Sequence, residues 1–278
     1  YQQGNVSFRK VEEILQANDL VEASGQSELS GIQTIRFNDY SFKYPTNETP
    51  TIEKINLEIK QGETLGIVGP TGSGKTTLIR QYPVNPAGSL SINDQPIQHY
   101  QIADLEKQIG YVPQEHILFS KNVAYNIRFG KDRATEQEIH DVVEFADFTK
   151  DVNRMTEGLD TLIGEKGVSI SGGQKQRISI ARGLIRQPEL LILDDSLSAV
   201  DAKTEQAIIR NIQAIRQGQT TIIITHRLSA VAKAHKVIVM DQGKIAEYGT
   251  PEQLLQQKGW YYQQHLKQQL EEDQHENI

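Results

Sequence analysis

The sequence lacks cysteine altogether in its 278 residues. This absence excludes disulfide bonds and thiolate metal sites, and it fits a reducing compartment. Long apolar runs are missing as well, since the longest, such as 190–193 and 222–224, have the length of a strand. A membrane-spanning helix needs about 20 apolar residues, so we expect this chain to be soluble by itself.

Positive charge is also scarce, with 29 Lys and Arg against 36 Asp and Glu and a net charge of −7. A general nucleic-acid binder has a basic surface, so we expect no nucleic-acid partner. Nucleotide binding remains open, because phosphates can be held locally by backbone amides, one lysine and a metal ion. The chain begins at Tyr1 and has no signal-peptide pattern, so we expect it to be a piece of a longer protein.

The most informative feature that is present is a glycine-rich segment that fits the pattern G-x-x-x-x-G-K-[ST]. It follows the apolar run 64–68, and residues 77–80 after it can open a helix. A strand, a glycine loop and a helix in this order predict a phosphate-binding loop rather than an ordinary glycine-rich turn. The segment consists of Gly69, Pro70, Thr71, Gly72, Ser73, Gly74, Lys75 and Thr76.

Each residue type in this loop has a physical role in phosphate binding. The glycines let backbone N–H groups point at a β-phosphate, where a Cβ would block the approach. The following helix directs the positive end of its dipole at the same place. Lys75 can reach the β- and γ-phosphates, and the Thr76 hydroxyl can bind Mg²⁺. The loop therefore predicts a site for nucleotide phosphates and Mg²⁺.

The order of apolar patterns predicts an α/β fold. Residues 35–37, 40–42 and 55–59 alternate as half-buried antiparallel strands do. Continuous apolar strands alternating with helices then indicate a parallel sheet covered on both faces. These strands are 109–112, 190–193, 221–224 and 237–240. The fold class is thus a P-loop NTPase core with a mostly parallel sheet, an N-terminal antiparallel β subdomain and an inserted α-helical subdomain.

The expected domain organisation has three parts. Residues 1–30 contain a short amphipathic helix and a polar linker. Residues 31–265 form the nucleotide-binding domain, with the helical subdomain at about 115–185, where the stretch from Thr135 to Phe145 is periodic. The Gln-rich end from Gln263 to Ile278 is expected to be a closing helix that frays into a solvated C-terminal tail at 266–278.

Two carboxylates follow the apolar run 190–193. In a parallel sheet, ligands bind beyond the carboxyl ends of the strands, so Asp194 should face the phosphates and bind the metal ion. Asp195 comes next and can orient an attacking water. The alternative is that both are solvated acids at the end of a strand.

A second glycine turn, Ile170-Ser171-Gly172-Gly173-Gln174, precedes another helical pattern. A helix N-terminus of this kind can receive an anion. One domain folds around one phosphate loop, so a second phosphate-binding turn makes sense if it serves a nucleotide bound to another protomer.

These motifs, in this order, resemble the nucleotide-binding domain of an ABC transporter over about residues 32–265. The ordered set is the phosphate loop, Gln114, residues 171–174, residues 190–195, residues 198–201 and Thr225-His226. The resemblance implies a head-to-tail dimer in which each ATP lies between one chain's phosphate loop and the other chain's glycine turn.

The resemblance also implies a role for each matching residue. Tyr44 would stack on adenine, and His226 would contact the γ-phosphate. Gln114 would contact the metal ion, take part in catalysis and couple the site to the membrane part. Lys75, Thr76 and Thr77 would bind phosphates and Mg²⁺. Ser171, Gly172, Gly173 and Gln174 would act in trans on the partner's nucleotide, and Asp201 would carry signals across the interface. Each single residue has a plainer alternative: Tyr44 as packing at a strand end, Gln114 as a loop amide, His226 as a histidine without a ligand.

More specifically, the chain is similar to exporters of the multidrug and peptide class. Residues 157–167 resemble the loop that contacts the partner's intracellular helices, and the N-terminal helix resembles the end of the last membrane helix. The resemblance implies an upstream transmembrane domain and a location at the cytoplasmic face of the cell membrane.

One residue departs from the family pattern. The family usually has glutamate after the metal-binding aspartate, and this chain has Asp195, whose carboxylate is withdrawn by about 1.5 Å. A misplacement of about 1 Å can lower a rate on the order of 10²-fold. The substitution resembles the degenerate half of heterodimeric exporters, so we expect a different partner chain with glutamate at this position.

Two alternatives to this interpretation remain, and residues 170–174 disfavour a third. The protein could be a homodimeric exporter with two slow sites. It could be a soluble ABC ATPase acting on nucleic acid or ribosomes, although the chain has neither an inserted coiled coil nor a second such domain. A small-molecule P-loop kinase would lack residues 170–174.

Overall fold

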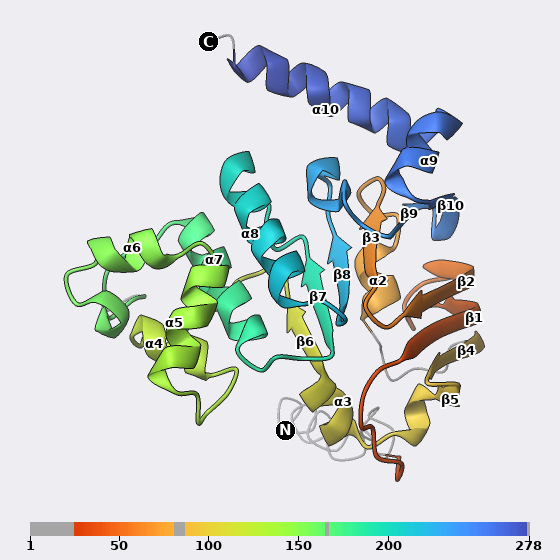
Figure 1. Ribbon diagram of the computed structural model, residues 1–278. Coiled ribbons are helices and arrows are strands. Elements are labelled where there is room, and N and C mark those ends of the chain that lie inside the picture. The colour runs from red at the N-terminus through yellow and green to blue at the C-terminus, as the bar shows by residue number, and fades with distance from the viewer. Residues whose placement is uncertain (1–24, 81–86, 165–166, 277–278) are drawn as a thin grey trace, which may run out of the picture.

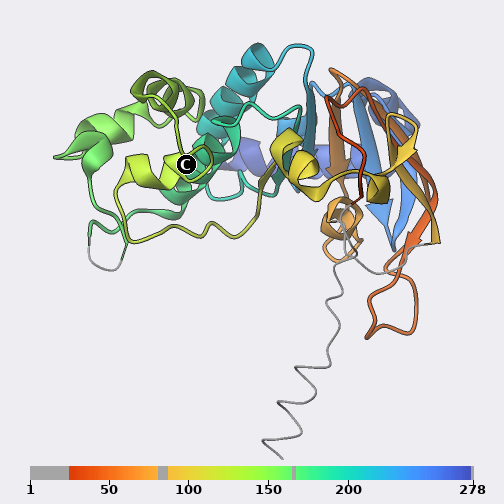
Figure 2. The same ribbon diagram turned by 90° about the horizontal axis from the view of Figure 1, so that it is seen from below.

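The computed structural model describes residues 25–80, 87–164 and 167–276. The helix expected near the N-terminus lies outside these residues. Two sheets and a group of helices make up the described chain (Figure 1). Figure 2 shows the helical lobe on one side, the antiparallel sheet on the other and the main sheet between them.

The antiparallel sheet has the order β2-β1-β4-β5. Its strands are β1 (Thr34–Phe42), β2 (Ile52–Lys60), β4 (Ala87–Ile92) and β5 (Gln95–Pro96). The expected strands at 35–37 and 40–42 are one strand, β1, interrupted by an irregularity in its pairing with β2. Asp39 has φ 49° at this point, a left-handed conformation that aspartate tolerates better than most residues.

The main sheet has the order β10-β9-β3-β8-β7-β6. Its pairs are parallel except for β9 with β10. The strands are β3 (Thr64–Val68), β6 (Ile109–Val112), β7 (Leu190–Asp194), β8 (Thr220–Ile224), β9 (Lys236–Asp241) and β10 (Lys244–Gly249). Strands β3, β7 and β8 are buried throughout, which is why their sequences are continuous apolar runs.

Helices cover the main sheet and form the lobe. Around the sheet lie α2 (Lys75–Ile79), α3 (Ile102–Gln108), α8 (Ala202–Ile215), α9 (Pro251–Gln257) and α10 (Trp260–Glu276), with 3₁₀ turns η1 (Ile97–His99) and η3 (Leu228–Val231). The lobe contains α4 (Val123–Arg128), α5 (Glu136–Phe145), α6 (Thr149–Arg154), η2 (Gly158–Asp160) and α7 (Gly172–Leu184). The periodic stretch at 135–145 is thus the helix α5, which Thr135 and Glu138 begin with a reciprocal capping box.

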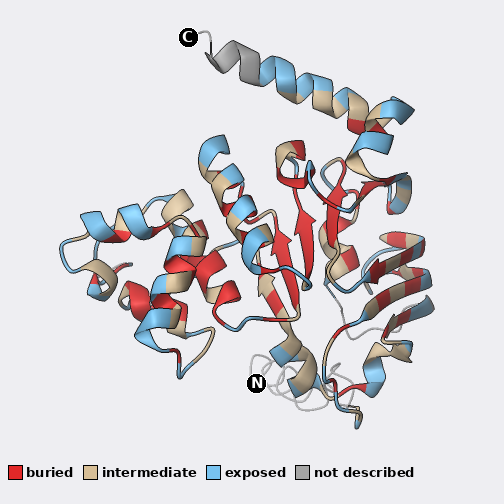
Figure 3. Cartoon of the chain, viewed as in Figure 1, coloured by how far each residue is buried: buried red, intermediate tan, exposed pale blue. Residues whose placement is uncertain are grey.

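The apolar side chains form two cores, one on each side of the main sheet. Along β7, Leu191 and Leu193 belong to the core shared with the helical lobe, while Leu190 and Ile192 belong to the core shared with the antiparallel sheet. Successive residues of a strand point to opposite faces, so one apolar run fills both cores. Figure 3 shows this burial along the central strands.

The end of the chain, where we expected a closing helix from Gln263, forms α10, which runs without a break from Trp260 to Glu276. Tyr261 is buried in the core, so the start of this helix belongs to the domain. Within the described ranges, no helix combines the length and apolar character that crossing a membrane requires.

Candidate nucleotide-binding site

The loop after β3 needs glycine for two separate reasons. Gly69, Gly72 and Gly74 have φ of 141°, 79° and 96°, which side chains other than glycine's rarely allow. A Cβ on Gly69 would also lie 2.1 Å from the Met240 carbonyl oxygen, and one on Gly74 would lie 2.8 Å from Ile52. At Gly69 and Gly74 the loop therefore packs directly against neighbouring segments of the chain, which leaves no room for a side chain.

Lys75 lies at the first position of α2, with only 7% of its surface exposed. Its ammonium donates hydrogen bonds to the carbonyl oxygens of Gly69 (2.9 Å) and Pro70 (2.7 Å). Burial lowers the pKa of Lys75, while Asp195 and Asp194 act in the opposite direction. No side chain caps the N-terminus of α2, and the buried Ser73 hydroxyl has no hydrogen-bond partner. A cation, uncapped amides and a free hydroxyl on one loop fit an anion.

Thr76 and Asp194 meet at the carboxyl end of β7. The Thr76 hydroxyl donates a hydrogen bond to one Asp194 oxygen at 3.0 Å, although 118 residues separate them. Both supply hard oxygen ligands of the kind Mg²⁺ prefers. No group of three or more His, Cys, Asp or Glu side chains in the described residues could hold a metal ion alone. The pair suits Mg²⁺, which usually takes one or two protein ligands besides phosphate and water.

Tyr111 is a residue of this site that the sequence motifs did not indicate. Its hydroxyl donates to the second Asp194 oxygen at 2.7 Å and accepts a hydrogen bond from Arg80 at 3.1 Å. Burial, and then the bond to Asp194, raise the pKa of Tyr111 to about 12, so the hydroxyl keeps its proton and orients the carboxylate. Parallel pairing of Tyr111 with Ile192 brings it here, and that register is not visible in the sequence.

Asp195 has a strained backbone, with φ 47°. Its N–H donates to the Ile224 carbonyl at 2.8 Å, and its carboxylate accepts a hydrogen bond from Gln114 at 3.1 Å. Burial raises the pKa of Asp195. The charge of His226 acts to lower this pKa, and the charge of Asp194 acts to raise it further. The structure therefore brings together three residues expected at the site: Gln114, Asp194 and Asp195.

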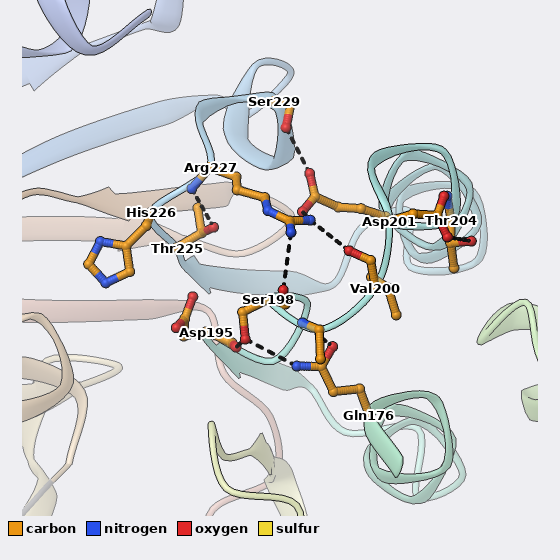
Figure 4. Close-up of polar contacts among 12 residues, drawn as sticks. Gln176, Asp195, Ser198, Val200, Asp201, Thr204, Thr225, His226, Arg227 and Ser229 are labelled. Atoms are coloured by element: carbon orange, nitrogen blue, oxygen red, sulfur yellow. Dashed lines mark hydrogen bonds and ion pairs between the residues drawn. The ribbon is translucent and has the colours of Figure 1, made fainter. Parts of the chain in front are cut away.

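His226 follows β8, and its ring lies on the same side as the Asp195 carboxylate (Figure 4). The next side chain, Arg227, points the other way. It donates hydrogen bonds to the carbonyl oxygens of Val200 (2.8 Å) and Ser198 (3.1 Å) and pairs with Glu205 (3.0 Å). Arg227 thus links the segment 198–200, which follows Asp195, to the segment that carries His226.

Asp201 ends this segment by capping α8. The Asp201 carboxylate accepts hydrogen bonds from the Thr204 N–H (3.0 Å) and from the Thr204 hydroxyl (2.7 Å). The Thr204 hydroxyl, followed by the Thr204 N–H, lowers the pKa of Asp201. Asp201 is exposed.

The glycine turn at 171–174 also has a local structural role. Ser171 and Gln174 form a reciprocal capping box at the start of α7 (3.2 and 2.9 Å). A Cβ on Gly173 would lie 3.1 Å from the Ala199 carbonyl oxygen. Gln176, one turn further, bonds the Ser198 hydroxyl (3.2 Å) and the Ala199 N–H (2.9 Å). The turn therefore packs against the segment after Asp195.

Tyr44 lies just after β1 and is connected to α2. Its hydroxyl is 3.2 Å from the Thr77 hydroxyl. Its ring packs edge-on against Phe42, with the ring centroids 5.0 Å apart. The aromatic ring is thus held next to the helix that follows the phosphate loop.

Comparison with known proteins agrees with this geometry. The profile of the family described as ABC transporter matches residues 52–198. A probable multidrug resistance ABC transporter ATP-binding/permease protein, YheI of Bacillus subtilis (strain 168), is 49% identical over 97% of this chain and 47% of its own length. The multidrug resistance-like ATP-binding protein MdlA of Escherichia coli (strain K12) is 41% identical over 97% of this chain and 46% of its own length.

A solved structure of a bacterial Atm1-family ABC exporter with ATP bound has a TM-score of 0.87 and 32% identity. That match covers 96% of this chain and 48% of the exporter chain. The fold and site thus define an ATP-binding domain of the ABC class. The chain belongs to the ABC transporter family, whose ATP-binding domains are ATPases. It spans about half the length of the curated relatives it matches.

Proposed function

We propose that the chain is the ATP-hydrolysing domain of an exporter and works as a head-to-tail dimer. The observation that carries this proposal is the separation of the site into two parts. Lys75, Thr76 and Asp194 gather at the phosphate loop, whereas Ser171 and Gly172 are exposed at the start of α7 in the helical lobe. An exposed glycine turn at a helix N-terminus suits a phosphate brought by a second protomer.

Within one site, the chain's own residues have distinct tasks. Lys75 and the loop amides would bind the phosphates, and Tyr44 would support the adenine. Thr76 and Asp194, with Gln114 nearby, would hold Mg²⁺, which neutralises phosphate charge when bound. Asp195 would orient the attacking water, and His226 would contact the γ-phosphate.

The Asp195 carboxylate favours a slow site. Gln114 donates to it directly, and its backbone is fixed by the bond to Ile224, so the short side chain has little freedom to advance towards a water. Burial also raises the pKa of Asp195, so a smaller fraction of this carboxyl group is ionised, as a water-orienting group must be, when the pH falls. These features support the half of a heterodimeric exporter with the weaker carboxylate, opposite a chain with glutamate. A homodimeric exporter with two slow sites is the second candidate.

An exposed apolar group on the lobe supports a membrane partner. The Arg182 guanidinium lies 5.8 Å and 5.7 Å from the ring centroids of Phe119 and Phe129 and donates a hydrogen bond to the Ile117 carbonyl. The exposed apolar residues are Ile117, Phe119, Tyr125 and Phe129. Such a patch marks a protein contact, and one relative, YheI, is named an ATP-binding/permease protein. A transmembrane domain at the cytoplasmic face of the membrane is the partner we propose, and this disfavours the soluble, nucleic-acid-related alternative.

Replacing Asp195 by glutamate tests the slow-site proposal. Single-turnover hydrolysis at saturating Mg-ATP should rise by one to two orders of magnitude, because the added methylene advances the carboxylate. The measurement is made on the full-length protein, alone and with its partner chain. If the partner's own glycine turn is degenerate, the gain will be small in the heterodimer and visible in forced homodimers, where Ser171 supplies the cap. A wild-type protein that already hydrolyses ATP at ordinary transporter rates would overturn the proposal.

A further inference from the structure

The C-terminal helix makes a direct contact with the segment that carries His226. Gln268, on α10, donates a hydrogen bond from its side-chain amide to the His226 carbonyl oxygen at 2.7 Å. Its amide oxygen accepts a hydrogen bond from the Leu228 N–H at 2.9 Å. One side chain thus holds the main chain on both sides of Arg227, from 40 and 42 residues further along the sequence.

The contact is supported at the base of α10. Glu247, on β10, accepts hydrogen bonds from the N–H groups of Trp260 and Tyr261, and the Tyr261 side chain is buried. Gln268 lies seven residues after Tyr261, which is two helical turns, so both face the domain. Leu266 and Leu270 are exposed. The helix is therefore anchored at its first turn and again at Gln268.

The segment 225–228 is otherwise held on its other side. The Thr225 N–H donates to the Ile67 carbonyl at 3.2 Å, and the Thr225 hydroxyl accepts from the Arg227 N–H at 2.9 Å. The Arg227 side chain reaches towards Ser198 and Val200. The Thr225 hydroxyl and Gln268 thus hold the two ends of the peptide unit between His226 and Arg227. Of these contacts, Gln268 also holds the next peptide unit, through the Leu228 N–H.

We propose that Gln268 is a positioning residue for His226, and that α10 is thereby part of the hydrolytic apparatus. This inference rests on the proposed role of His226 at the γ-phosphate. The ring direction of His226 depends on its own backbone, and the two Gln268 hydrogen bonds, one to the His226 carbonyl oxygen and one from the Leu228 N–H, restrict the rotation of this segment. Loss of both bonds lets the ring move by a fraction of an ångström, and misplacement by about 1 Å can lower a rate on the order of 10²-fold. With the other contacts in place, we expect about a 3- to 10-fold effect.

The test compares Gln268→Ala and Gln268→Met with Gln269→Ala in the full-length protein assayed without a different partner chain, so that hydrolysis reports this chain's own site. The methionine variant keeps most of the side-chain volume and loses both hydrogen bonds, and Gln269 is the exposed neighbour on the same helix. Steady-state hydrolysis should show kcat lower by about 3- to 10-fold in both Gln268 variants, with the KM for ATP within about twofold of wild type. The Gln269 variant should match the wild type, and thermal unfolding should confirm that all variants are folded.

A double variant separates this inference from the role of His226. If Gln268 acts through His226, then adding Gln268→Met to His226→Gln should lower the residual single-turnover rate by less than twofold, because the effects are not additive. Additive effects, or an unchanged kcat in both Gln268 variants, would overturn the inference. An unchanged rate in His226→Gln alone would instead overturn the proposed role of His226.

Discussion

Arg227 and Glu205 form an ion pair, 3.0 Å long, at the point where three segments of the site meet. The Glu205 side chain is almost fully buried, and that of Arg227 is 38% exposed. Ser229 donates a second hydrogen bond to the same carboxylate at 2.7 Å. Through Arg227, the carboxylate on α8 holds the carbonyl oxygens of Ser198 and Val200 next to the segment of His226.

Replacing Arg227 by alanine should lower the free energy of unfolding by about 2–3 kcal/mol, because the buried Glu205 carboxylate loses its counter-ion. The expected loss is below that of a fully buried pair, since Arg227 is partly exposed. Urea denaturation measures it. Arg36→Ala is the matched control, because Arg36 pairs with Glu58 and Asp94 at the surface, where ion pairs contribute little to stability, so this variant should lose much less. Equal losses in both variants would contradict a special role for the Arg227 pair.

Replacing Tyr44 by alanine should weaken the binding of every adenine nucleotide by about 1–3 kcal/mol, the usual value of base stacking. Equilibrium titration with ATP and with ADP measures the two affinities. Tyr44→Phe keeps the ring and loses the hydroxyl contact with Thr77, so it should cost about 1 kcal/mol or less. A loss for ATP alone would count against stacking on adenine.

Replacing Ser171 by arginine should leave ATP binding to the chain alone unchanged and impair hydrolysis in the dimer. The bulky cation would stand where the partner's nucleotide has to approach. Ser171 also caps α7, and loss of a cap costs about 1 kcal/mol. Ser171→Ala is therefore the control, since it loses the cap without adding bulk. If Ser171→Arg weakens ATP binding to the chain alone, the two-chain site is wrong.

Replacing Asp195 by asparagine should stabilise the protein slightly at neutral pH, by about 1 kcal/mol or less, while reducing hydrolysis. Burial raises the pKa of Asp195 in the folded state, so the folded chain binds its proton more readily than the unfolded chain. Ionisation at neutral pH therefore opposes folding. The advantage of the asparagine variant should shrink as the pH falls towards about 4, the unfolded pKa.

Denaturation midpoints at several pH values between about 4.5 and 8 provide this measurement. Asparagine also tolerates the left-handed backbone at this position, so backbone strain does not confuse the comparison. If the wild type is the more stable protein at pH 7, and increasingly so at higher pH, the folded-state pKa of Asp195 is lowered and the interpretation fails.

Local sequence determined much of this protein. The phosphate loop, the strand ending in Asp194 and the parallel sheet were predicted from the sequence because each depends on a short-range rule. Glycine at a left-handed turn and continuous apolar runs in doubly covered strands are such rules. The expected strands 109–112, 190–193, 221–224 and 237–240 are confirmed as β6, β7, β8 and β9.

Contacts between distant segments were decided by the tertiary structure alone. Tyr111 meets Asp194 because β6 pairs with β7, and Gln268 meets His226 because α10 folds back from β10. The capping box of Ser171 and Gln174 follows a short-range rule. The packing of the neighbouring Gly173 against Ala199 follows no such rule. A tyrosine or glutamine without a motif gives no local sign of its partner, since side-chain hydrogen bonds between distant segments depend on strand register and helix direction.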